Sequence, residues 1–287
     1  MKKKVFITGG GGMLASQIEK FYRQKEYEVL APHHAELDIL NDSALLDAIS
    51  SFRPDYVFHT AALHVNDSEE NPELAFKVNS RASEKVACFC SSADAVLIYI
   101  SSCGYFGDEI KYYSESDEVK LKTVYARTKY EGERLAIQAN DKTFAIRPGW
   151  LFGGEITHKK NFVYQRYLEA KMSSIVRSAS DKYGTPTYIE DFVRKMEEII
   201  ETGKFGLYHL TNSGGCSRAQ YVKKIIKSCN LKTDVEKVDS SNFPRKADTP
   251  DCELLNNSKL TNLGLSPMPY WEEAIERYSR VMLKQKG

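Results

Sequence analysis

The sequence predicts an α/β protein built on a doubly wound parallel sheet, and three observations support this fold class. Short apolar runs alternate with helical stretches through the first 150 residues. A run of four glycines follows the first apolar run at once. The helical stretches are long enough to connect parallel strands, and such connections are right-handed. Together these features are typical of a parallel sheet with helices on both faces.

Buried strands are expected in the β-rich apolar runs at 4–8, 28–31, 56–60, 95–101 and 143–147. Apolar residues recur at helical spacing between them, which predicts helices over 14–25, 43–51, 72–91 and 124–140. Beyond Gly153, helical stretches are expected at 156–174, 188–201 and 218–229. A short strand at 208–211 is expected to return to the first sheet, so the boundary near residue 150 is soft.

Composition excludes several classes of protein. The 287 residues include 40 basic and 39 acidic side chains, so the net charge is +1. This balance lacks the excess of positive charge that is typical of proteins that bind nucleic acid or an anionic membrane. No apolar run approaches the ~20 residues of a membrane span. Residues 1–4 are basic but lack the apolar core of a signal peptide, so we expect a cytoplasmic chain. Six cysteines without a C-x-x-C pair are expected to be reduced.

The glycine run forms a phosphate-binding pattern. Residues 8–15 fit G-x-x-G-x-x-G/A, with Gly9, Gly12 and Ala15 at the key positions. Glycine permits a tight turn and close approach to a pyrophosphate, which faces the N-terminus of the next helix. We therefore place a dinucleotide-binding (Rossmann) domain at 1–153 and a mainly substrate-binding region at 154–287. A plain strand-to-helix turn is the simpler alternative. The candidate cofactor contacts here are Thr8, Gly9, Gly11, Gly12, Met13 and Leu14.

The second strand does not distinguish NADPH from NADH. It ends in Pro32-His33-His34, which offers neither an acidic residue for a ribose 2′-hydroxyl nor an arginine for a 2′-phosphate. The two histidines could contact such a phosphate, although exposed loop histidines are the simpler interpretation. The sequence therefore does not decide between NADPH and NADH.

A catalytic group is indicated by Tyr125 and Lys129, which form a Y-x-x-x-K pair on one helix face. A nearby ammonium is expected to lower the pKa of the phenol, as a general acid requires. An exposed helix face is the alternative for this pair by itself. Ser102, however, ends the fourth strand at the carboxyl edge of the sheet, where such folds bind ligands. It could donate a hydrogen bond there.

The order of glycine turn, serine and Y-x-x-x-K resembles the extended short-chain dehydrogenase/reductases. Features shared with that superfamily are Asp38-Ile39, Ala61-Ala62, Asn79 and residues 147–153. The C-terminal half is similar, more specifically, to the dTDP-4-dehydrorhamnose reductase family. The segments that carry this similarity are 183–188, 206–210, Pro244-Arg245 and 255–260.

The resemblance implies reduction, by NADPH or NADH, of the 4-keto group of a nucleotide-linked 6-deoxyhexose in deoxysugar or surface polysaccharide synthesis. It implies that Tyr125 protonates the C4 oxygen, that Lys129 tunes the phenol and holds the nicotinamide ribose, and that Ser102 polarises the carbonyl. A homodimer is a fair expectation for such enzymes. The resemblance adds the cofactor contacts Asp38, Ile39, Ala61, Ala62 and Asn79, and the substrate contacts Asn66, Cys103 and Trp150.

The chain departs from the family pattern near the expected sugar site. Cys103 and Gly104 replace an acidic and an aromatic residue, Ala126 replaces a glycine, and Arg218 replaces a tryptophan. The sugar contacts are therefore expected to differ.

Two other functions share these features. One is a nucleotide-sugar epimerase or dehydratase that recycles tightly bound NAD, and the other is a non-catalytic regulatory subunit that keeps the fold.

Cys103 is interpreted as a small wall residue and not as a reactive thiol, because no base is predicted beside it. His64 and His209 lack metal-ligand spacing, so no protein-bound metal is expected.

Overall fold

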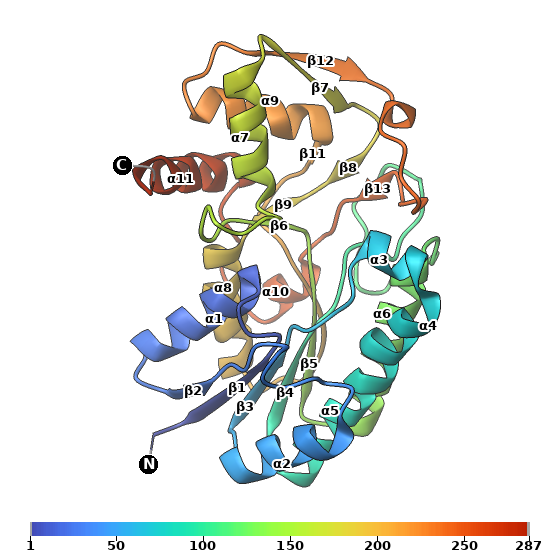
Figure 1. The fold of residues 1–287 in the computed structure, drawn as a ribbon, viewed down its shortest axis with the longest axis vertical. Coiled ribbons are helices and arrows are strands. Elements are labelled where there is room, and N and C mark those ends of the chain that lie inside the picture. Colours follow the sequence, from blue (N-terminus) through green and yellow to red (C-terminus); the bar gives the residue numbers. More distant parts are fainter. Residues whose placement is uncertain (1, 286–287) are drawn as a thin grey trace.

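The computed structural model describes residues 2–285 and is organised around a six-stranded parallel sheet (Figure 1). The strand order is β10-β5-β4-β3-β1-β2, and each neighbouring pair is parallel. The strands are β1 (Lys4–Thr8), β2 (Glu28–Leu30), β3 (Tyr56–His59), β4 (Val96–Ile100), β5 (Thr143–Pro148) and β10 (Gly206–Leu210). The predicted fold class is confirmed, and the strand near 208 does join this sheet beside β5.

Helices cover both faces of the sheet, as Figure 1 shows. Helices α1 (Met13–Gln24) and α8 (Ile189–Glu201) cover one face, where Ile7 and Ile18 are fully buried. The opposite face is covered by α2 (Asp42–Phe52), α5 (Ala82–Ser92) and α6 (Val124–Ala139), where Phe6 and Val86 are fully buried. Burial on both faces explains why these strands are continuous apolar runs.

The remaining elements form a second layer beyond the carboxyl ends of the strands (Figure 1). Its small sheets pair β6 with β9, β7 with β12, and β8 with β11 and β13. The strands are β6 (Trp150–Phe152), β7 (Ile175–Ala179), β8 (Tyr183–Gly184), β9 (Pro186–Tyr188), β11 (Cys216–Ser217), β12 (Asp234–Val238) and β13 (Cys252–Glu253). The helices are α7 (Phe162–Met172), α9 (Arg218–Ser228), α11 (Trp271–Lys284) and the short 3₁₀ turn η2 (Ser240–Asn242). Helix α10 (Ser258–Asn262) instead packs beside β10 of the central sheet. The exact split near residue 153 stays a prediction.

Two of the predicted helices were wrong in detail. The helix expected at 156–174 begins only at Phe162, because Asn161 caps it by accepting a hydrogen bond from the Tyr164 N–H at 3.2 Å. The helix expected at 72–91 is divided into α4 (Pro72–Phe76), a π-helical turn η1 (Lys77–Arg81) and α5. In this turn the Asn79 side chain bonds to the Leu63 backbone, so the interruption serves a tertiary contact. A short helix α3 (Val65–Glu70) precedes them.

The sheet order places a crevice between β1 and β3. From β1 the chain moves outward to β2, then crosses to β3 on the other side of β1 and continues to β4 and β5. In open α/β sheets ligands bind at this reversal, outside the carboxyl ends of the strands. The glycine turn after β1 and the residues after β4 both lie at this edge.

A buried ion pair joins helix α6 to the sheet. The Arg147 guanidinium donates to both carboxylate oxygens of Glu133, at 2.8 and 2.6 Å, and both side chains are 3% exposed. The Ser101 hydroxyl donates to the same carboxylate at 2.6 Å. The bidentate geometry and the added donor satisfy the charges that burial removes from water.

Glu133→Gln is expected to lower the free energy of unfolding by about 3–5 kcal/mol, because it leaves the Arg147 charge buried and unpaired. Urea denaturation measures this change. The matched control is Glu131→Gln on the same helix, whose exposed pair with Arg134 should contribute less than about 0.5 kcal/mol. Equal effects of the two substitutions would contradict the assigned role of the buried pair.

Candidate active site

A cavity of about 640 Å³ contains most of the predicted catalytic and substrate residues. Ser102 and Cys103 follow β4, Tyr125 lies in the first turn of α6, Asn66 lies on α3, and Trp150 begins β6. The remaining lining residues are His64, Val65, Asp67, Gly104, Thr123, Lys160, Arg218, Arg245, Thr249, Pro250 and Glu253. Lys129 is 2% exposed and is not among the lining residues.

The start of helix α6 fixes the position of Tyr125. The Thr123 hydroxyl caps the helix by accepting from the Ala126 N–H at 2.9 Å. The Glu69 carboxylate accepts from the Val124 N–H at 2.6 Å, so a second element holds the same turn. Tyr125 and Ser102 both line the cavity, and the Ser102 side chain is near enough to lower the pKa of the Tyr125 phenol.

The expected lowering of the phenol pKa is not found in this structure. Burial raises the pKa of Tyr125 to about 12, and the nearby Ser102 side chain opposes this effect only in part. The phenol is therefore protonated near neutral pH, which suits a group that donates a proton.

Lys129 is occupied within the chain. Its ammonium donates to the Ile100 carbonyl oxygen at 2.8 Å and lies 4.1 Å from the centre of the Tyr99 ring. Burial lowers the pKa of Lys129 to about 7, although the Glu133 carboxylate raises it. The ammonium thus lies at the end of β4, one residue before Ser101.

The glycine turn has the shape that a dinucleotide pyrophosphate requires. Gly9 and Gly11 have φ angles of +74° and +77°, which favour glycine. A Cβ atom on Gly9 would lie 3.0 Å from the Ala61 Cα, so the turn packs closely against the chain after β3. Gly12 gives α1 no side-chain cap, which leaves the first N–H groups of this helix free for an anion. The backbone of this turn and the start of α1 therefore fit the pyrophosphate of a dinucleotide cofactor.

The other predicted cofactor residues differ in their exposure and in their hydrogen-bond partners. Asp38 is exposed and Ile39 is buried after β2, and Ala61 and Ala62 are half-buried after β3. The Thr8 hydroxyl is bonded to His59 Nδ1 at 2.7 Å. These contacts with a cofactor stay predictions.

Asn79 is fully buried, and its amide bonds to Leu63 and to Thr128 Oγ1. This residue therefore positions the loop after β3, and a direct cofactor contact stays a prediction. His33 is exposed with its ring against Gly11, and it leaves NADPH and NADH both open.

The far wall of the cavity contains residues that the sequence did not identify as a group. The Trp150 indole N–H donates to Glu253 at 2.6 Å, and the Arg218 guanidinium stacks 3.4 Å from the Trp150 ring centre. Burial and the Glu253 carboxylate raise the pKa of Cys103, which is consistent with a wall residue and not with a reactive thiolate. Glu253 comes from β13, and no motif marks it.

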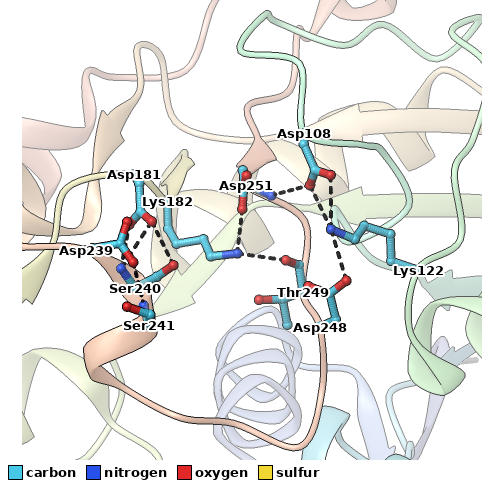
Figure 2. Close-up of polar contacts among 10 residues, drawn as sticks. All are labelled: Asp108, Lys122, Asp181, Lys182, Asp239, Ser240, Ser241, Asp248, Thr249 and Asp251. Carbon is cyan, nitrogen blue, oxygen red and sulfur yellow. Dashed lines mark hydrogen bonds and ion pairs between the residues drawn. The ribbon is translucent and has the colours of Figure 1, made fainter.

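Part of the cavity wall comes from residues 239–251, which we call the strap. Arg245, Thr249 and Pro250 of the strap line the cavity. Figure 2 shows Lys122 bridging Asp108 at 3.0 Å and Asp248 at 3.2 Å. The strap is thereby attached to the segment that leads into helix α6.

The two ends of the strap are attached to the second layer (Figure 2). Lys182 donates to the Thr249 carbonyl oxygen at 2.8 Å and pairs with Asp251 at 2.6 Å. The Ser240 hydroxyl donates to Asp181 at 2.7 Å. The strap thus has contacts at both ends and at Asp248.

Within residues 2–285 the structure has neither a metal-ligand cluster nor a membrane-spanning helix. No group of three or more His, Cys, Asp or Glu side chains there could hold a metal ion. No helix in this part of the chain has the length and hydropathy to span a bilayer. His209 is fully buried, and both of its ring nitrogens are hydrogen-bonded. Its Nδ1 donates to the Tyr113 carbonyl oxygen, and its Nε2 accepts from the Arg147 guanidinium.

Comparisons with known proteins match nearly the whole chain. The family model described as RmlD substrate binding domain matches residues 3–283. Spore coat polysaccharide biosynthesis protein SpsK of Bacillus subtilis is 27% identical over 96% of this chain and 96% of its own. A dTDP-4-dehydrorhamnose reductase of Mycolicibacterium smegmatis is 29% identical over 96% of this chain and 85% of its own. The Bacillus anthracis dTDP-4-dehydrorhamnose reductase in complex with NADP has a TM-score of 0.92 at 31% identity, covering 97% and 99% of the two chains.

Lys129→Met is expected to raise the free energy of unfolding of the cofactor-free chain by about 4–5 kcal/mol near pH 6, because each tenfold difference in proton affinity between the folded and unfolded states contributes about 1.4 kcal/mol. The pKa of Lys129 is about 7 in the fold and 10.5 as its ordinary value, so the unfolded chain binds this proton more readily. The destabilisation is fully present below pH 7 and disappears as the pH rises to 10.5.

Urea denaturation across this pH range measures the difference between the variant and the parent chain. Lys20→Met, at an exposed position on α1, is the control and should show no such trend. A difference that is constant with pH would contradict the buried ammonium as its cause.

Proposed function

Because the chain belongs to the RmlD substrate binding domain family, we propose that it is an NAD(P)-dependent oxidoreductase acting on a nucleotide sugar. The reaction is reduction of the 4-keto group of a nucleotide-linked 6-deoxyhexose, as in a dTDP-4-dehydrorhamnose reductase. Relatives with that name cover nearly the full chain, and SpsK supports a role in polysaccharide synthesis.

The single observation that carries this proposal is that Ser102 and Tyr125 line the same cavity, with the Ser102 side chain near enough to lower the pKa of the phenol. Two hydroxyl donors placed together can both bind one carbonyl oxygen. Ser102 polarises the carbonyl, and Tyr125 transfers its proton to the C4 oxygen as that oxygen becomes an alkoxide. A phenol pKa near 12 keeps this proton in place until the negative charge develops.

The cofactor is NADPH or NADH, and it supplies the hydride when bound. The glycine turn at Gly9, Gly11 and Gly12 would hold its pyrophosphate with backbone N–H groups at the start of α1. Lys129, which lies beside Ile100, would hold the nicotinamide ribose through its ammonium.

The cavity also has the charges that a nucleotide diphosphate requires. Lys160 and Arg245 line it, and both can bind phosphate oxygens. Asn66, Cys103 and Trp150 would contact the sugar. We further propose that the enzyme works in the cytoplasm and forms a homodimer.

Tyr125→Phe is expected to lower kcat by about 10²- to 10⁴-fold, because the substrate then loses its proton donor. The assay is the absorbance of NADPH during reduction of dTDP-4-dehydrorhamnose. The affinity for NADPH, measured by cofactor fluorescence, should stay within about threefold, since the substitution leaves the glycine turn intact. Tyr270→Phe, at an exposed position, is the control and should keep full activity.

Stoichiometry separates this function from the alternatives. The proposed reductase consumes one NADPH per product. Conversion of the sugar without net consumption would instead indicate an epimerase or dehydratase with recycled NAD. Binding of NADPH without turnover of any nucleotide-linked keto sugar would indicate a non-catalytic subunit.

A further inference from the structure

Arg218 presents an unpaired cation to the cavity. Its guanidinium lies flat on Trp150, 3.4 Å from the ring centre, and 5.3 Å from the centre of the Phe162 ring. Within the described part of the chain its side chain forms no hydrogen bond or ion pair, although its backbone N–H donates to Lys182. Stacking holds the plane of the guanidinium and leaves the N–H groups at its edge free to donate.

Glu253 presents an acceptor held by the same indole. The Trp150 N–H donates to Oε2 at 2.6 Å, while Oε1 has only a long contact of 3.6 Å with the Cys103 thiol. Trp150 therefore holds a carboxylate at its edge and a guanidinium on its face. Glu253 and Arg218 attract each other but form no ion pair in the described residues, so a polar group between them could bind both.

The Glu253 carboxylate and the Ser102 hydroxyl both lie close to Gly104. A Cβ atom on Gly104 would lie 3.2 Å from Glu253 Oε1 and 3.4 Å from Ser102 Oγ. The carboxylate is thus near enough to a carbonyl bound at Ser102 to reach a substituent on the adjacent ring carbon.

We propose that Glu253 and Arg218 determine substrate specificity by binding a hydroxyl group on the ring carbon next to the reacting carbonyl. This inference rests on the proposed function, in which the carbonyl is C4. C5 of a 6-deoxyhexose carries the methyl group, so the hydroxyl is the one on C3. A hydroxyl both donates, here to Glu253, and accepts, here from Arg218. A carboxylate would be repelled by Glu253, and an ammonium would be repelled by Arg218.

The test compares two substrates, dTDP-4-dehydrorhamnose and its 3-deoxy analogue, by kcat/KM with NADPH. The parent chain should prefer the 3-hydroxyl sugar by at least about 100-fold, because the analogue lacks the hydroxyl that Glu253 and Arg218 would both bind. In Glu253→Ala and in Arg218→Met the preference should fall below about tenfold, through loss of activity on the 3-hydroxyl sugar alone. Calorimetric binding of dTDP-rhamnose should weaken in both variants, which gives a readout independent of turnover.

The control is Lys223→Met, an exposed cation on the same helix as Arg218, which should keep the parent preference. Glu253→Gln retains the volume of the side chain and an oxygen for Trp150, so it tests the charge if the alanine variant fails to fold. NADPH affinity checks that each variant is folded.

A preference that survives in both variants, or a parent chain that reduces both sugars equally, would overturn the specificity proposal and leave the reductase function standing. A parent chain that binds NADPH but reduces neither sugar would overturn the proposed function, and the specificity proposal with it.

Discussion

The bidentate pair between Glu133 and Arg147 is the contact on which the geometry of the site depends. It joins α6, which carries Tyr125 and Lys129, to β5 of the central sheet. The Ser101 hydroxyl completes the shell of the carboxylate, and Ser102 is the next residue. Helix and strand therefore have one relative position, and the two hydroxyl groups that face the cavity meet because of it. A hydrophobic contact would permit sliding that a bidentate pair with a third donor does not.

Local patterns were sufficient to predict the sheet, because strands buried on both faces are apolar runs and the connecting helices keep their own periodicity. They were also sufficient to predict that Ser102 and Tyr125 lie near each other. One residue follows a strand at the carboxyl edge and the other lies in the first turn of a helix, so the topology brings both into one cavity. The expected effect of Lys129 on the phenol was not found, because the Lys129 ammonium donates to the Ile100 carbonyl and burial raises the pKa of Tyr125.

The far wall of the cavity could not be predicted in this way. Glu253 reaches Trp150 because β13 pairs with β8, a contact between segments far apart in the sequence. The π-helical turn at η1 was also missed, since its cause is the long-range bond of Asn79 to the loop after β3. The deciding partners lie 16 residues apart for Asn79 and Leu63 and 103 residues apart for Trp150 and Glu253, beyond the reach of periodicity or capping rules.

The strap is held to the rest of the molecule in part by exposed ion pairs, which makes its attachment sensitive to salt. Lys246 pairs with Glu70 at 2.7 Å, and both side chains are more than half exposed, as is Asp248 in its pair with Lys122. Dissolved ions weaken exposed pairs of this kind but hardly affect the apolar packing between sheet and helices. Rising ionic strength should therefore loosen this part of the cavity wall before it affects the Ser102 and Tyr125 hydroxyls, so that the shape of the cavity and its chemistry respond to different properties of the surrounding solution.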